Sequence, residues 1–212
     1  MMKADGHKVI SSVPILWAML VVLAACNLLL IRQNLQLRAQ LNSPEPPSLQ
    51  PGEKVPSFSA QGLRGETIEV NYGRAGRKRV LLYFTPKCPY CHGQFAYWRE
   101  LLEHADRDRF EVIGIARDKE DRAKLEEYLR RYGCDGASPT PLRVALVSDE
   151  VRRSYKLSAT PITLIVAGDG AVERAWEGRW DAAQAAEAGR LFGLDLSAAS
   201  AAAAARPPGD AP

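Results

Sequence analysis

The chain has 212 residues, of which 46% are apolar, enough to bury the core of one domain and leave residues for further segments. Its 28 basic and 25 acidic residues give a formal net charge of +3. They are mixed along the chain, without the long basic runs that are typical of a nucleic-acid-binding protein. We therefore expect no nucleic-acid partner. Four cysteines are too few for a secreted scaffold held together by disulfides.

A long apolar segment lies near the N-terminus. Residues 9–31 contain no charged side chain and would span about 34 Å as a helix, enough to cross the hydrocarbon core of a membrane. We expect a transmembrane helix here, after a short N-terminal flank of residues 1–8. A cleaved signal peptide is one alternative. A lipid anchor at Cys26 is another, because LAAC at residues 23–26 resembles a bacterial lipobox.

Two segments differ in composition from a folded domain. Residues 32–51 are predicted to form a stalk and a proline-rich spacer. Residues 32–41 could continue the helix as a short stalk or form a solvated extension, whereas the prolines of residues 42–52 are incompatible with a helix. Residues 197–212 are rich in alanine and proline and offer almost nothing to bury, which predicts a disordered tail. The folded domain is therefore expected at residues 52–196.

Within residues 52–196, short β-branched or apolar runs alternate with helical patterns, which indicates an α/β fold. The composition of GDG at 168–170 predicts a tight turn between the last two strands, which would form an antiparallel hairpin. Strands are expected at 67–70, 80–85, 110–116, 142–148, 162–167 and 171–177, and helices at 89–105, 119–132, 149–155 and 181–192.

The stretch KCPYC places two cysteines where an expected strand ends and an expected helix begins. Unpaired backbone N–H groups and the helix dipole favour a thiolate at this position. Pro89 suits the first helical residue, and Lys87 adds a cation beside Cys88. We expect Cys88 to be the solvent-facing nucleophile and Cys91 the more sheltered thiol that resolves the adduct.

Two further residues in or next to this stretch are candidates for shifting the pKa of the Cys88 thiol. Tyr90 lies between the cysteines, and His92 follows the second one. The alternative for His92 is a solvent-facing side chain without a role in the chemistry.

Three features in chain order resemble membrane-anchored thioredoxin-like proteins of the TlpA and ResA type, which are redoxins. They are G-x-x-V-P-x-F at 52–58, the C-x-x-C that opens a helix, and Thr160-Pro161 directly before the hairpin. The resemblance covers residues 52–180. It implies a thioredoxin-like fold, in which helices flank a central mixed sheet, behind the N-terminal transmembrane helix.

The resemblance also implies a function. Pro161 would follow a cis peptide bond and face a redox-active Cys88–Cys91 disulfide, and the backbone of Thr160 would bind the client. The partners would be protein thiols and disulfides, with a membrane thiol donor supplying electrons to a reductase. Such exchange needs neither a metal nor an organic cofactor. The catalytic domain would lie on the periplasmic side of a bacterial inner membrane.

Two positions depart from the family pattern. Lys87 stands where these proteins usually carry tryptophan, which changes the surface that meets the client. Leu82 stands where thioredoxins place a buried acid, so the proton of Cys91 must be accepted by another group or by water.

Other functions for the cysteine pair remain alternatives. A peroxiredoxin-like thiol peroxidase is one, because Thr85 precedes Cys88 by three residues, although Leu81 replaces the proline of the fuller motif. A non-catalytic binding module with an inert disulfide is another.

Metal binding is a weaker alternative. A structural zinc site would need Cys134 and His92 as additional ligands, and copper delivery would call for a histidine later than His104. We expect Cys134 to be a semi-buried free thiol.

Overall fold

The computed structural model describes residues 13–41, 48–73 and 77–204. It divides into two units, residues 1–45 and residues 46–212. The described part of the first unit is a single helix, α1 (Val13–Leu41).

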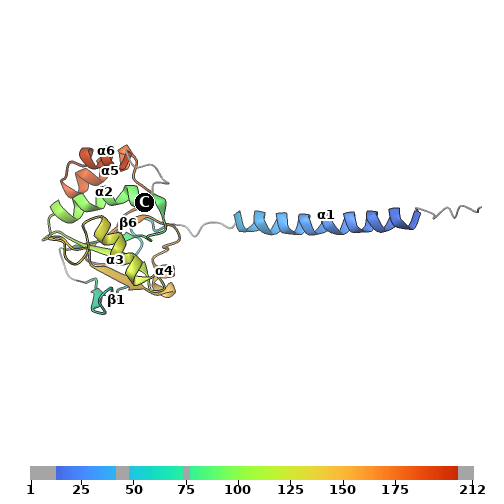
Figure 1. Ribbon diagram of the computed structural model, residues 1–212. Helices are drawn as coiled ribbons and strands as arrows, with labels where there is room; N and C mark the ends of the chain where they lie inside the picture. Colours follow the sequence, from blue (N-terminus) through green and yellow to red (C-terminus); the bar gives the residue numbers. More distant parts are fainter. Residues whose placement is uncertain (1–12, 42–47, 74–76, 205–212) are drawn as a thin grey trace, which may run out of the picture. The chain divides into compact units, whose positions relative to one another are not determined.

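Helix α1 is one continuous helix (Figure 1), and its large apolar side chains from Ile15 to Leu35 are exposed. Residues 14–36 have a mean hydropathy of 2.4 and are long and apolar enough to cross a membrane, a test that an N-terminal signal sequence also passes. The helix extends ten residues beyond the expected end of the span at residue 31, so residues 32–41 form the helical stalk that was one of the two alternatives for them. Residues 9–12, the expected start of the span, lie outside the described part.

The second unit is built on a seven-stranded mixed sheet with the strand order β2-β1-β5-β4-β3-β6-β7. Strands β3, β4 and β5 are parallel, and the remaining neighbours pair antiparallel. The strands are β1 (Phe58–Gly62), β2 (Thr67–Val70), β3 (Lys78–Tyr83), β4 (Phe110–Arg117), β5 (Val144–Val147), β6 (Ile162–Val166) and β7 (Val172–Glu177).

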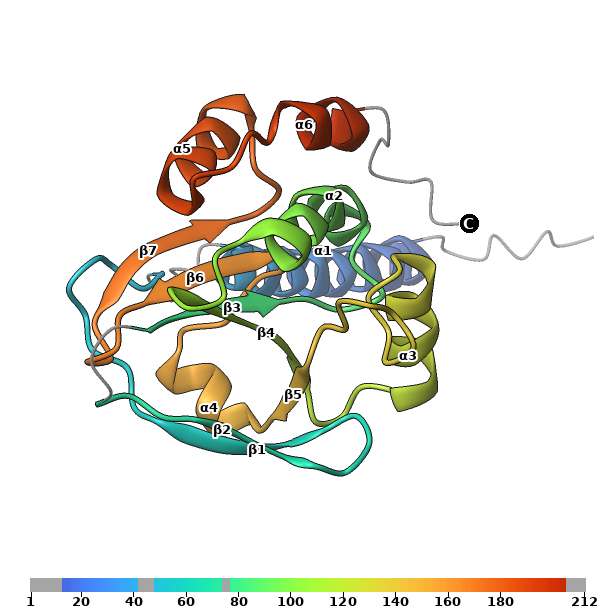
Figure 2. The same cartoon turned by 90° about the vertical axis from the view of Figure 1, so that its left-hand side faces the viewer.

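Helices cover both faces of this sheet. Figure 2 shows α2, α5 and α6 on one side and α4 on the other. The helices are α2 (Pro89–His104), α3 (Arg122–Arg131), α4 (Asp149–Ser154), α5 (Ala182–Phe192) and α6 (Ser197–Ala204).

Strand β3 and the residue after it divide their side chains between two cores. Val80, Leu82 and Phe84 are buried with α2, α3 and α5, whereas Leu81 and Tyr83 are buried with β2 and the loop after α4. Because both faces of this central strand are covered, the run from Val80 to Phe84 is apolar throughout. Burial on both faces fixes the end of β3, from which the cysteine segment leaves the sheet.

Capping residues set the helix starts on either side of the site. Asp121 accepts hydrogen bonds from two backbone N–H groups of α3, and the Ser148 hydroxyl accepts one from Val151 in α4. Asp181 and Gln184 form a capping box at the start of α5. Each of these residues stops the helix from extending backwards into the loop before it.

The strands and helices predicted within residues 52–196 are all present, with ends that differ by up to three residues. Two elements were not predicted. Strand β1 was missed because FSAQG carries little apolar character, and it is held by backbone pairing between β2 and β5. Helix α6 occupies part of the tail that we expected to be disordered, and Ala199 in it is buried.

The domain boundaries also differ from the expected ones. Leu49 is buried in the core beside Val55, so the folded unit begins before Gly52. At the other end, α6 packs against α2 and extends the unit to Ala204. Residues 205–212 of the predicted tail lie outside the described part.

Candidate active site

The cysteine pair lies where the sequence places it, at the start of α2. Cys88 is the N-cap residue, and Pro89 occupies the first helical position. No side chain caps the helix through a hydrogen bond, so the first N–H groups of α2 remain available to a thiolate. Both cysteines are free thiols in this structure.

The two thiols differ in exposure in the expected order. Cys88 is 8% exposed, whereas Cys91 is completely buried. Cys88 is thus less solvent-facing than we expected. Its neighbours in the sequence, Lys87, Pro89 and Tyr90, are exposed.

The pKa of Cys88 is lowered to about 5, chiefly by a hydrogen bond from the Cys91 thiol. Burial opposes this effect, while the Thr160 side chain and the backbone N–H groups of Cys91 and Tyr90 support it. The Lys87 side chain is not among these causes. The neighbouring thiol and the helix start therefore lower this pKa.

The pKa of Cys91 is shifted in the opposite direction. Burial raises it far above the ordinary range, and the hydrogen bond to Cys88 raises it further. A backbone hydrogen bond from Thr85 works against both effects. At neutral pH the pair therefore contains one thiolate and one thiol, which is the division of roles that disulfide exchange requires.

Thr160 and Pro161 meet the cysteines from the other side of the site. The peptide bond between them is cis, as expected. While Cys88 is protonated, its thiol donates a hydrogen bond to the Thr160 carbonyl across 3.2 Å. The Pro161 carbonyl accepts one from Gly178, which fixes this loop to the segment after β7.

His92 does not face solvent, contrary to the alternative that we considered. It is buried, and its Nδ1 forms a hydrogen bond with the Tyr132 hydroxyl. Its ring also lies against Tyr128, at 5.1 Å between centroids. Nδ1 is therefore occupied by a protein partner, and among the described residues no group of three or more His, Cys, Asp or Glu is placed to hold a metal ion.

Sequence reasoning missed three polar residues around the site. Tyr128 lies in α3, and Tyr132 is the C-cap residue of that helix. Burial is the main cause that raises the pKa of Tyr128, and negative charge on Cys91 or Cys88 raises it further. Glu120 accepts a hydrogen bond from the Thr85 hydroxyl at 3.0 Å. No local motif marks these residues, because they approach the cysteines only through the fold.

Cys134 is fully buried rather than semi-buried. Its thiol donates to the Tyr132 carbonyl, and burial raises its pKa to about 11. A protonated, inaccessible thiol is a poor nucleophile, so the structure gives Cys134 no part in the exchange.

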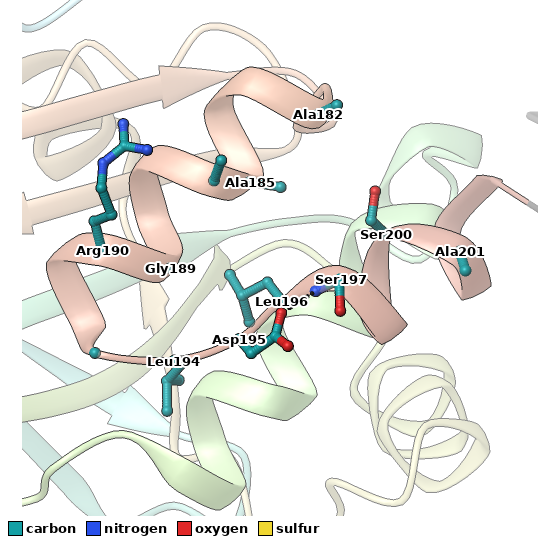
Figure 3. Close-up of a pocket in the computed structure, with 12 residues that line it drawn as sticks. Ala182, Ala185, Gly189, Arg190, Leu194, Asp195, Leu196, Ser197, Ser200 and Ala201 are labelled. Atoms are coloured by element: carbon teal, nitrogen blue, oxygen red, sulfur yellow. Dashed lines mark hydrogen bonds between the residues drawn. The ribbon is translucent and has the colours of Figure 1, made fainter.

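A cavity of about 850 Å³ between α5 and α6 is separate from this site (Figure 3). Alanine, glycine and serine form most of its wall, with Arg190 and Asp195 as charged residues. Neither cysteine lines it, nor does the loop that contains Thr160. It is therefore not part of the candidate active site.

Several solved structures share the fold of this chain. A protein from Chlorobium tepidum whose proposed identity is the thiol:disulfide interchange protein DsbE has a TM-score of 0.56 and 19% identity, with 69% of this chain and 98% of that chain covered. The thioredoxin domain of a thiol-disulfide oxidoreductase from Bacteroides vulgatus has a TM-score of 0.54 and 15% identity, with 68% and 99% covered. At these identities the likeness shows the fold.

A third solved structure is similar, a thioredoxin-family thiol:disulfide interchange protein from Chlorobium tepidum TLS, with a TM-score of 0.51 and 18% identity over 69% of this chain and 99% of that chain. No curated protein sequence is significantly similar to this chain. The model of the AhpC/TSA family matches residues 51–175, which is more than half of the chain. The chain therefore belongs to the AhpC/TSA family and is a thiol-based oxidoreductase with a thioredoxin-like fold.

Proposed function

We propose that this protein is a membrane-tethered, extracytoplasmic thiol-disulfide oxidoreductase that reduces disulfides in client proteins. The observation that carries the proposal is the opposite shift of two neighbouring thiols, with a pKa of about 5 for Cys88 and a raised pKa for Cys91. Cys88 is then ionised and nucleophilic at neutral pH, and Cys91 is held in reserve as a thiol.

The reaction proceeds in two exchanges. The Cys88 thiolate attacks one sulfur of the client disulfide and forms a mixed disulfide, and the other client sulfur leaves as a thiolate that takes a proton from water. Cys91 then loses its proton and attacks the Cys88 sulfur, releasing the second client thiol. The client gains two electrons, and the Cys88–Cys91 pair becomes a disulfide.

The loop at Thr160 is the proposed client-binding edge. The Thr160 carbonyl is 3.2 Å from the Cys88 sulfur. An extended client segment that pairs with the Thr160 backbone beside Pro161 would bring its own sulfur to Cys88. Pairing through backbone groups tolerates many client sequences.

The proposed direction of electron flow depends on which molecule reduces the Cys88–Cys91 disulfide after each turnover. A membrane dithiol donor would reduce the Cys88–Cys91 disulfide by the same exchange, without a metal or an organic cofactor. A pKa of about 5 stabilises the reduced form of the protein. Its proposed clients are therefore disulfides that are reduced more readily than very stable structural ones.

Thiol peroxidase activity is the competing function, since Thr85 precedes Cys88 as in peroxiredoxins. The Thr85 hydroxyl, however, donates to Glu120 rather than to the Cys88 sulfur, which favours disulfide exchange. We expect the full chain in detergent to reduce insulin disulfides with dithiothreitol as the electron source, and to consume hydrogen peroxide no faster than its Cys88→Ser variant. Rapid peroxide consumption that requires Cys88, without insulin reduction, would replace the proposed function by the peroxidase.

The tether is proposed from the length and apolar composition of residues 14–36. We expect a membrane-impermeant maleimide to label Cys88 in intact cells, and the labelled chain to stay with the membrane after alkaline carbonate washing. Labelling only after the cells are broken would place the domain on the cytoplasmic side. Recovery of a soluble, shortened chain would indicate a cleaved signal sequence, and a diacylated Cys26 at a new N-terminus would indicate a lipid anchor.

A further inference from the structure

A cavity of about 490 Å³ opens between α4 and the loop that leads to Thr160. Its polar lining is dominated by cations from the end of β4 and from α4 and its C-terminal end, and Leu157 and Ser158 form part of the remaining wall. Figure 2 shows α4 on the opposite side of the sheet from α2. The four cations that line the cavity are Arg117, Arg152, Arg153 and Lys156.

Asp149 is the one carboxylate among the described residues that line this cavity. It is shared by three cations, at 2.7 Å from Lys119, 2.8 Å from Arg152 and 3.7 Å from Arg117. The hydrogen bonds from Lys119 and Arg152 lower its pKa to about 2, so it is ionised at neutral pH. Even when charged, a single carboxylate leaves the group with an excess of positive charge.

Of the other two cations, Arg153 adds to this excess. The charge of Lys156 is offset by Glu53, which lies 2.7 Å away, whereas the side chain of exposed Arg153 forms no ion pair or hydrogen bond among the described residues. Asp118 and Glu150 are exposed at nearby sequence positions but do not line the cavity. The cavity therefore offers an anion several charged donors in a confined place.

Arg152 joins this cavity to the elements that form the active site. Its Nε donates to the Tyr83 hydroxyl at 3.0 Å, and its Nη2 donates to the Leu157 carbonyl at 3.2 Å. Tyr83 is the last residue of β3, which leads to Cys88, and Leu157 lies in the loop that leads to Thr160. The Arg152 side chain therefore holds the loop against the sheet at this edge.

Ser158, in the wall of the cavity, is close along the chain to Thr160, which lies beside the reacting sulfur. Ser158 precedes Thr160 by two residues, so their Cα atoms are at most about 7 Å apart, and Cys88 lies against the Thr160 carbonyl. A client strand that pairs with Thr160 rises about 3.3 Å per residue. A side chain two to four residues from the client cysteine can therefore reach the Ser158 end of the cavity.

We propose that this cavity is a subsite for an acidic side chain, Asp or Glu, two to four residues from the reacting cysteine of the client. The inference rests on the proposed disulfide exchange and adds a preference among clients. Arginine binds carboxylates through paired hydrogen bonds, and a surplus of positive charge beside the site speeds the encounter with an acidic segment. The positive charge of the cavity complements the negative charge of a carboxylate, so we infer that its ligand is a carboxylate of the client polypeptide.

The test uses the full chain in detergent and disulfide-linked peptides that differ at one position, three residues from the cysteine, which is Glu, Gln or Lys. We expect kcat/KM for the Glu peptide to exceed that for the Gln peptide about fivefold at low salt, with the Lys peptide lowest. The ratio should fall as salt is raised to about 0.3 M, because the charges are partly exposed.

Arg153→Gln and Arg153→Gln/Lys156→Gln should bring the ratio of the Glu to the Gln peptide close to one. Arg130→Gln is the matched control, because Arg130 is exposed on α3 and does not line this cavity. It should keep the full ratio. Arg152 is left unchanged, since its loss would also release the loop at Leu157.

The outcomes separate the subsite from the proposed function. Equal reduction of all three peptides, or a preference for Glu that survives the double variant, overturns the subsite and leaves disulfide exchange intact. No reduction of any peptide overturns both. Phosphatidylglycerol vesicles provide a further arm: if they bind the wild type but not the double variant, and the peptides show no charge preference, the cavity binds a lipid headgroup instead.

Discussion

Replacing Cys91 with serine should turn a transient client adduct into one that accumulates. Cys91 is completely buried next to Cys88, whose sulfur accepts its hydrogen bond, so it attacks the mixed disulfide from within the same molecule. Without it, release depends on an external thiol, and the adduct should persist on the order of 100-fold longer. Non-reducing electrophoresis followed by mass spectrometry would locate the adduct on Cys88.

The companion variants define the roles of the other thiols. Cys88→Ser should reduce insulin turnover to the uncatalysed background, because a serine hydroxyl is not ionised at neutral pH. Cys134→Ser is the matched control, since Cys134 is fully buried and its pKa is raised to about 11. It should leave both turnover and trapping unchanged. Adducts recovered on Cys134 would contradict this assignment.

The proton on Cys91 links this prediction to the surroundings of the site. Leu82 occupies the position of the buried acid of thioredoxins, and it is fully buried in an apolar core. The titratable groups on this side of the sheet include His92, Tyr128 and Tyr132, which pack against one another. The resolving step therefore takes place beside an aromatic cluster with hydroxyl and imidazole groups, where thioredoxins have a carboxylate.

The features that the sequence predicts well are local or strongly apolar. Strand β3 is buried on both faces and appears in the sequence as the apolar run VLLYF, and the cysteines follow it at the start of a helix. Hydrophobic pattern and helix-start chemistry locate both without knowledge of the rest of the fold. Thr160 and Pro161 are more distant, and their place opposite Cys88 was known only through the family resemblance.

The features that were missed depend on contacts between distant parts of the chain. Tyr132 lies forty residues from His92, and nothing in RYGC indicates that its hydroxyl meets the imidazole. Composition was misleading at the C-terminus, where an alanine-rich segment without a large apolar residue still forms α6 and buries Ala199. Small side chains allow close packing against α2 with little apolar surface, which a search for hydrophobic runs does not detect.

Phe84→Ala should destabilise the domain and also weaken the thiolate. Phe84 is fully buried directly after β3, and its ring lies 5.3 Å from Phe95, 6.1 Å from Trp98 and 5.8 Å from Tyr128. Removing a buried phenylalanine ring costs about 3–5 kcal/mol, a large part of the roughly 5–15 kcal/mol of an ordinary domain. Urea unfolding at neutral pH would measure the loss.

The effect on the site is measured by the pH dependence of Cys88 alkylation. In the wild type the thiolate reacts and the thiol does not, so the rate should rise with pH around a midpoint of about 5 and level off above it. Phe84 packs against Phe95 in α2, and loosening this contact frees the helix start whose N–H groups stabilise the thiolate. The midpoint should therefore move upward, toward the ordinary thiol value near 8.5.

Phe192→Ala separates this local effect from general destabilisation. Phe192 is equally buried in the same core but packs on Phe110 from α5, at 4.9 Å between ring centroids. It should lose a similar free energy of unfolding and keep the alkylation midpoint near 5. If both variants shift the midpoint alike, the Cys88 pKa depends on the stability of the whole domain rather than on the seating of α2. If neither shifts it, the hydrogen bonds of the CPYC turn stabilise the thiolate without support from the aromatic core.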